Sequence, residues 1–306
     1  MQHADSLEAV SLEKPSVVTI GAFDGVHRGH QKLIAELVSE AHAQDRAAAV
    51  ICFFPHPDVV LRGITGRYYL TSPDERARLL AELGVDVLVV HPFNDEVRHV
   101  RAADFVQRLR DHLKMAALWA TADFAMGFNR EGDIGFLRAQ GVEVHTIEMV
   151  APDGNGDRIS SSAIRAALEA GDVSKAAEWL GRPYRIAGEV IGGAQRGRSI
   201  GFPTANIDIW EEQVIPANGV YACRTFLGGE TFNAVTNVGV RPTFEGVGVT
   251  VEAHIFDFDR DIYGQTLSLD FMQRLRGEQK FDGIEALVAQ IKQDAKQART
   301  LLSGAG

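Results

Sequence analysis

The sequence has little cysteine, an excess of acidic residues and no long apolar run. Its only cysteines are Cys52 and Cys223, and each lies inside an apolar stretch, as is typical of buried thiols in a reducing compartment. The formal net charge of −10 argues against a protein that grips nucleic acid over a wide surface, although a local basic pocket for a nucleotide remains compatible with it. The polar first ten residues do not suit a signal peptide, and no stretch is apolar enough to span a membrane. We therefore expect a cytoplasmic protein with no nucleic-acid or membrane partner, and the sequence allows a transient oligomer.

The length of 306 residues predicts two domains. In the first part of the chain, apolar runs alternate with amphipathic segments, which indicates parallel strands covered by helices on both faces. The expected strands are 17–20, 47–54, 85–93, 118–121 and 142–147, and the main expected helices are 31–43, 72–83 and 102–114. This order predicts an α/β, Rossmann-like domain whose ligands bind at the carboxyl ends of the strands.

The pattern changes near residues 181–185. Beyond this point short β-rich runs alternate with glycine turns, which predicts a small closed barrel. A terminal helix is expected at 281–302, with Ile284, Leu287, Val288 and Ile291 facing inward. We expect domains at 1–183 and 184–306.

The stretch GAFDGVHRGH, residues 21–30, stands between an expected strand and an expected helix. Such a turn admits a phosphate close to backbone N–H groups and to the positive end of the helix dipole. His27 and His30 would share one helix face and act on the same polyphosphate. Asp24 fits either an Asx-turn or a contact to Mg²⁺.

Three further stretches of the first part carry polar residues at strand ends or helix starts. Ser160, Ser161, Ser162 and Arg165 open an expected helix, where they would hold a triphosphate or serve only as a helix cap and a surface cation. His56 lies between two prolines and fits either a structural role or a ligand contact. The loop ADFAMGFNREGD, residues 122–133, follows another strand.

The second part contains GGAQRGRSIGFPTAN, residues 192–206. Its arginines suit a positive loop over phosphates or a solvated glycine hairpin, whereas Thr204 and Asn206 offer oxygen ligands to Mg²⁺ from one strand face. Residues 237–244, NVGVRPTF, look like a second rigid loop. Glu252 would face away from Val251 and Ala253, as a general base or as an exposed strand residue.

Taken together, GAFDGVHRGHQ, FFPHP, ISSSAIR, LGRPY, RGRSIGFPTANI, NVGVRPTF, VEAHIFDF and LRGEQKF resemble the prokaryotic bifunctional riboflavin kinase/FAD synthetases. The resemblance runs in order from about residue 17 to residue 299. It implies an N-terminal nucleotidylyltransferase domain of the HxGH superfamily and a C-terminal β-barrel kinase domain. It further implies that riboflavin, FMN and ATP are the small-molecule substrates, with Mg²⁺ as cofactor and FAD as product.

The resemblance also implies roles for individual residues. Glu252, His27 and His30 would be catalytic, Glu252 by accepting the proton of the ribityl 5′-hydroxyl. Thr204 and Asn206 would bind the metal. The residues expected to bind nucleotide are Gly21, Phe23, Asp24, His27, Gly29, His30, Ser161, Ser162, Arg165, Arg196, Gly197 and Arg198. Those expected to bind flavin are His56, Asp123, Phe124, Asn237 and Arg241.

One loop departs from the family pattern. Thr121, Ala125 and Met126 stand where the family usually has glycine, arginine and an aromatic residue. Loss of a charge-assisted contact would cost FMN affinity roughly ten-fold to a hundred-fold. This leaves open a kinase with an impaired first domain, besides a non-catalytic flavin or nucleotide sensor and an HxGH transferase with another acceptor.

Overall fold

The computed structural model describes residues 1–148, 159–193, 197, 200–243 and 246–303, with the backbone alone for residues 241–243 and 246–247. The chain forms two compact units. The first contains Met1–Tyr68 and Ser72–Ser161, and the second contains Tyr69–Thr71 and Ser162–Gly306. The contacts thus divide the chain near residue 161, before the expected boundary at 183. Which segment folds on its own stays a prediction.

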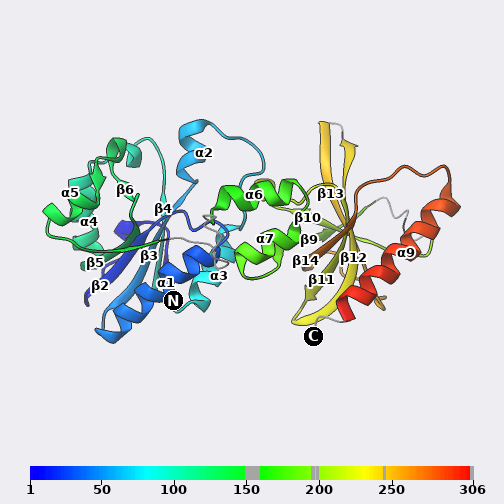
Figure 1. Cartoon of the computed structure of the whole chain (residues 1–306), viewed down its shortest axis with the longest axis horizontal. Coiled ribbons are helices and arrows are strands. Elements are labelled where there is room, and N and C mark those ends of the chain that lie inside the picture. The colour runs from blue at the N-terminus through cyan, green and yellow to red at the C-terminus, as the bar shows by residue number, and fades with distance from the viewer. Residues whose placement is uncertain (149–158, 194–196, 198–199, 244–245, 304–306) are drawn as a thin grey trace. The chain divides into compact units, whose positions relative to one another are not determined.

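A six-stranded parallel sheet in the order β1-β4-β3-β2-β5-β8 forms the centre of the first unit (Figure 1). Its strands are β1 (Gln2–Ala4), β2 (Ser16–Ile20), β3 (Ala47–Phe54), β4 (Val87–Pro92), β5 (Met115–Thr121) and β8 (Glu143–Ile147). All five strand pairings are parallel, as the alternating pattern predicts. Only the short β1 was not expected from the sequence.

Helices cover both faces of this sheet. They are α1 (Arg28–Ala43), α2 (Pro57–Arg62), α3 (Pro73–Glu82), α4 (Ala102–Leu113) and α5 (Ile134–Ala139). Neighbouring residues of β3 serve opposite faces, since side chains alternate along a strand. Ile51 packs in a cluster with Phe105 of α4, whereas Val50 packs in another with Ile34 of α1 and Leu80 of α3. The continuous apolar run of this central strand follows from its burial on both faces.

The polar loops of the first unit follow the carboxyl ends of the adjacent strands β3, β2 and β5. The loop after β5 is not wholly irregular, because it contains the short hairpin of β6 (Ala125–Met126) and β7 (Gly132–Asp133). This hairpin presses on the start of α4. A Cβ at Gly127 would lie 2.6 Å from the backbone nitrogen of Ala102, so a larger residue would force the two apart.

The second unit is a closed barrel in the order β10-β13-β12-β11-β14-β9, as predicted. Its strands are β9 (Tyr184–Ile191), β10 (Ala205–Ile209), β11 (Gly219–Leu227), β12 (Glu230–Thr243), β13 (Gly246–Ile255) and β14 (Thr266–Arg276). Helices α6 (Ser161–Glu169) and α7 (Val173–Leu180) precede the barrel, and α9 (Ile284–Ser303) follows it. The apolar side chains of α9 pack on the barrel through Ala298 and Leu302.

Two expectations for the second unit are wrong. Residues 237–243 are not a loop but the end of β12, where they pair with β13 as far as Thr243 opposite Gly246; residue 244 lies outside the described residues. Ile284 does not face inward, because 68% of its surface is exposed. The helix meets the barrel through its later turns, so its first turn has no core to cover it.

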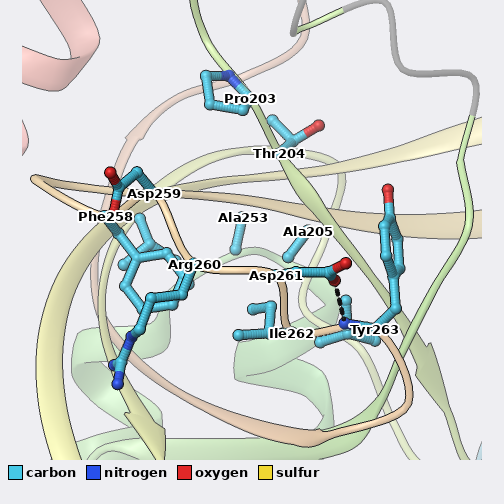
Figure 2. Close-up of a pocket in the computed structure, with 12 residues that line it drawn as sticks. Pro203, Thr204, Ala205, Ala253, Phe258, Asp259, Arg260, Asp261, Ile262 and Tyr263 are labelled. Atoms are coloured by element: carbon cyan, nitrogen blue, oxygen red, sulfur yellow. Dashed lines mark hydrogen bonds between the residues drawn. The ribbon is translucent and has the colours of Figure 1, made fainter.

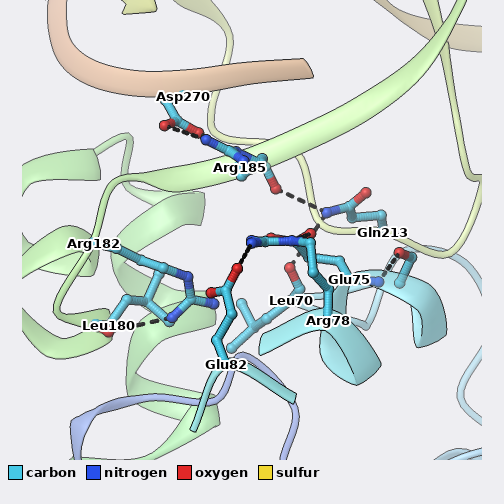
Figure 3. A network of polar contacts seen from close by, with 10 residues as sticks. Leu70, Glu75, Arg78, Glu82, Leu180, Arg182, Arg185, Gln213 and Asp270 are labelled. Carbon is cyan, nitrogen blue, oxygen red and sulfur yellow. Dashed lines mark hydrogen bonds and ion pairs between the residues drawn. The ribbon is translucent and has the colours of Figure 1, made fainter. Parts of the chain in front are cut away.

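Residues 69–71 belong to the second unit and join it through main-chain bonds. The Tyr69 N–H donates to the carbonyl of Glu212 and its carbonyl accepts from Val214. Gln213 Nε2 donates to the carbonyls of Leu70 and Arg185, at 3.3 and 3.1 Å (Figure 3). Within the described residues, no helix is both long and apolar enough to cross a membrane.

Candidate active sites

The turn between β2 and α1, residues 21–30, places two histidines at a helix start. His27 is the N-cap of α1, and its Nδ1 accepts the backbone N–H of His30 at 3.3 Å. Because Nδ1 accepts, a neutral His27 ring carries its proton on Nε2. Phe23, Gly25 and Val26 have positive φ values of 49°, 81° and 40°, so the backbone turns sharply before the helix begins.

The imidazole of His30 lies between two rings. Its centroid is 3.6 Å from that of His27 and 5.0 Å from that of Phe23. Burial, and then the charge of His27, hold the pKa of His30 well below its usual 6.5. Its Nδ1 is buried and has no hydrogen-bond partner within the described part of the chain. This side chain is therefore neutral at pH 7, with a ring nitrogen that a ligand can engage.

The other expected nucleotide residues near this turn are mostly buried. Phe23 and Asp24 are buried, Gly29 lies inside the first turn of α1, and the Gly21 N–H donates to the carbonyl of Ile51. Ser161 Oγ donates to the carbonyl of Asp24 at 2.9 Å. Since a hydroxyl has one proton, Ser161 holds the turn here, and its contact to phosphate stays a prediction.

Ser162 and Arg165 belong to the second compact unit, and their contact to nucleotide also stays a prediction. The flavin residues expected in the first unit lie in two loops. His56 is the N-cap of α2, since its Nδ1 accepts the N–H of Asp58 at 3.0 Å. Asp123 is exposed and Phe124 is half-buried. Of the three residues that depart from the family pattern, Met126 is buried in the main core.

In the second unit, three polar residues stand side by side on neighbouring strands. Glu252 of β13 is opposite Asn206 of β10 and opposite Asn237 of β12. Residues opposite one another in a sheet share a face. The flanking Val251 and Ala253 are buried, so Glu252 faces away from them, as the sequence predicts.

Two cavities of about 350 Å³ each lie beside this row. The first is lined by Val190, Ala253 and the segment from Phe258 to Tyr263 (Figure 2). Glu252 and Asn237 line the second, which the apolar side chains of Leu287 and Ile291 border. Thr204 lines both cavities. Each volume is within the range of sites for small organic ligands.

The donor set between these cavities fits a small hard cation. Thr204 and Asn206 both offer neutral oxygen atoms, with the carboxylate of Glu252 opposite Asn206. Two glycines leave room for them. A Cβ at Gly193 would lie 2.1 Å from Asn206 Nδ2, and one at Gly197 would lie 2.2 Å from the carbonyl oxygen of Phe202.

Several residues of the second cavity were not singled out from the sequence. Arg276 binds Asp294 of α9 through three contacts of 2.8–3.1 Å. His254 Nδ1 lies 2.8 Å from the carbonyl oxygen of Pro203, which fixes the ring proton on Nδ1. The LRGEQKF stretch was a signal for Arg276 and Glu278, but nothing in the sequence shows that α9 supplies Asp294.

Other expected residues lie wholly or partly outside the described part of the chain. Arg196 and Arg198 are outside it, as is the side chain of Arg241, whose backbone pairs with Gly248. Their roles stay predictions.

Comparison with known proteins assigns both units. Residues 10–163 match the FAD synthetase family and residues 180–302 match the riboflavin kinase family. A bifunctional riboflavin kinase/FMN adenylyltransferase from Listeria monocytogenes is 36% identical over 94% of this chain and 92% of its own. One from Pseudomonas fluorescens is 40% identical over 93% and 92%.

A crystal structure described as a macrolide-efflux protein from Streptococcus pneumoniae has the same fold. Its TM-score is 0.88 at 31% identity, over 97% of this chain and 98% of that one. The identities to the curated relatives extend over nearly the whole of both chains, and the two family matches fall in the order of the two units. The chain belongs to the bifunctional riboflavin kinase/FMN adenylyltransferase family.

Proposed function

We propose that the second unit transfers the γ-phosphate of ATP to the 5′-hydroxyl of riboflavin, and that the first unit then transfers AMP from a second ATP to the FMN formed. The observation that carries the kinase assignment is the place of Glu252, between Asn206 and Asn237 at the wall of a cavity. The His27–His30 pair at the start of α1 carries the second assignment.

In the kinase reaction Glu252 accepts the proton of the ribityl hydroxyl as its oxygen attacks the γ-phosphorus. The bond from that phosphorus to the β,γ-bridging oxygen breaks, and ADP leaves. Riboflavin occupies the second cavity, where Leu287 and Ile291 provide an apolar border for the flavin. ATP occupies the first cavity, with its phosphates toward Thr204, which lines both.

Thr204 and Asn206 would hold Mg²⁺ through their oxygen atoms. The ion supplies charge neutralisation on the phosphates when bound. Asn237 lies opposite Glu252 and orients the hydroxyl that Glu252 deprotonates. These roles follow from oxygen donors gathered on one face of the barrel.

In the adenylyl transfer a phosphate oxygen of FMN attacks the α-phosphorus of ATP. The bond from this phosphorus to the α,β-bridging oxygen breaks and pyrophosphate leaves. His27 donates its Nε2 proton to the phosphates, and neutral His30 contributes its ring through the unpartnered Nδ1. The N-terminus of α1 adds backbone N–H donors and a favourable dipole. The free, buried thiols of Cys52 and Cys223 suit the proposed cytoplasmic location.

The two assignments are tested separately by supplying either riboflavin or FMN with MgATP to the full chain. We expect Glu252→Gln to lower FMN formation about a hundred-fold or more and to leave the conversion of FMN to FAD unchanged. His27→Asn should have the opposite effect. If both reactions fall together in either variant, while its thermal unfolding matches the wild type, the division of roles is wrong.

A further inference from the structure

Three alternate carbonyl groups of the turn at residues 21–30 are bound by side chains from three helices. Arg76 Nη1 of α3 donates to Ala22 O at 3.0 Å, and Gln31 Nε2 of α1 donates to Val26 O at 2.8 Å. The third is the bond from Ser161 Oγ to Asp24 O, described above. The backbone of the turn is therefore held by donors outside it, two of which are distant in the sequence.

These bonds compensate for an unfavourable backbone. Phe23 and Val26 adopt positive φ, a conformation that costs a residue with a side chain about 1–2 kcal/mol. A carbonyl dipole that turned toward a phosphate would also repel it. Side-chain donors at residues 22, 24 and 26 keep the turn in shape and hold its carbonyl oxygens away from an anion.

Arg76 differs from the other two donors because it is charged and buried. Only 1% of its surface is exposed, and its Nη2 has no hydrogen-bond partner among the described residues. In the same part of the chain, no carboxylate is paired with it. A buried cation without a partner costs several kcal/mol, so its charge is available to an anion bound nearby.

The surroundings of Arg76 keep this charge unscreened. Phe23, Val26, Leu79 and Leu80 form an apolar cluster on this side of the turn. Cys52 belongs to the same cluster, and although burial raises its pKa to about 11, the charge of Arg76 acts in the opposite direction. In such surroundings a charge interacts over a longer range than in water.

We propose that Arg76 is a positioning residue of the adenylyl transfer. Its Nη1 fixes the Ala22 carbonyl, and its buried charge strengthens the binding of the ATP polyphosphate at the turn. The inference rests on the proposed adenylyl transfer in the first unit. It concerns the affinity for ATP in that reaction and leaves the kinase reaction untouched.

The test uses Arg76→Gln, which keeps a donor for Ala22 but removes the charge, and Arg76→Lys, which keeps the charge. Arg78→Gln is the matched control, because Arg78 lies on the same helix but is half-exposed and paired with Glu75 and Glu82. Each full-length variant is assayed with FMN and varied MgATP, and separately with riboflavin and varied MgATP.

We expect Arg76→Gln to raise the KM for ATP in FAD formation about ten-fold, with a smaller change in kcat. Arg76→Lys should stay within about three-fold of the wild type, and the kinase constants of all three variants should be unchanged. A purely structural role would lower the melting temperature and the active fraction but leave this KM unaltered, which would overturn the proposal. An equal effect of Gln and Lys would also overturn the role of the charge. If the wild type itself made no FAD from FMN, the proposed function would fail instead.

Discussion

The imidazole rings of His27 and His30 stack with their centroids 3.6 Å apart and their planes inclined by 18°. Two imidazolium ions at this distance repel each other strongly. Burial first, and the charge of His27 second, therefore keep the pKa of His30 well below 6.5. The pair binds phosphate through neutral donors and the helix start rather than through two fixed positive charges.

The buried His30 makes the first unit sensitive to acid. The unfolded chain takes up this proton below about pH 6.5, but the folded chain does so only at much lower pH. The free energy of unfolding should therefore fall as the pH drops below 6.5, by up to about 1.4 kcal/mol per pH unit. Unfolding measured between pH 5 and pH 8 should show this slope, and His30→Asn should reduce it. The exposed His3 gives the control His3→Asn, whose slope should match the wild type.

Two adjacent glycines give a matched test of the kinase site. A Cβ at Gly193 would lie 2.1 Å from Asn206 Nδ2, whereas one at Gly192 would meet nothing within 4 Å. Gly193→Ala should displace Asn206 and lower the kinase kcat about ten-fold or more, with a raised requirement for Mg²⁺. Gly192→Ala should behave as the wild type in the same titration. Equal kinetics of the two variants would contradict the role of Asn206.

The Arg276–Asp294 pair joins α9 to the barrel at the second cavity. Its two side chains are only 16% and 4% exposed. Asp294→Ala leaves the Arg276 charge without its partner and should lower the free energy of unfolding by about 3–5 kcal/mol. Asp257→Ala, which breaks the exposed Arg299 pair on the same helix, should have a clearly smaller effect. Chemical denaturation of the full chain measures both.

The fold followed from the sequence because its periodic patterns are strong. The β3 run is apolar throughout since both of its faces are buried, and α1 and α4 present clear apolar stripes. The end of β12 was misjudged as a loop because glycine and proline interrupt its apolar pattern, although the pairing with β13 holds it as a strand. Ile284 was placed in the core because periodicity shows which face is apolar, not how far the barrel extends beneath it.

The sites divide in the same way. Local patterns indicated His27, His30, Thr204, Asn206 and Glu252, because each lies at a turn or alternates within a strand. Arg76 and Asp294 could not be predicted, since each acts through a contact with a segment distant in the sequence. An arginine within a polar helix stretch looks exposed until the fold places a turn above it.

The most direct test of the account is a single incubation of the purified chain with riboflavin, ATP and Mg²⁺, followed by chromatographic separation of the flavins. We predict that FMN rises first and that FAD then accumulates with one pyrophosphate for each FAD formed. Accumulation of FMN alone would contradict the adenylyl transfer and would indicate that the loop with Ala125 and Met126 has disabled the first unit. Riboflavin left unchanged would contradict the whole account.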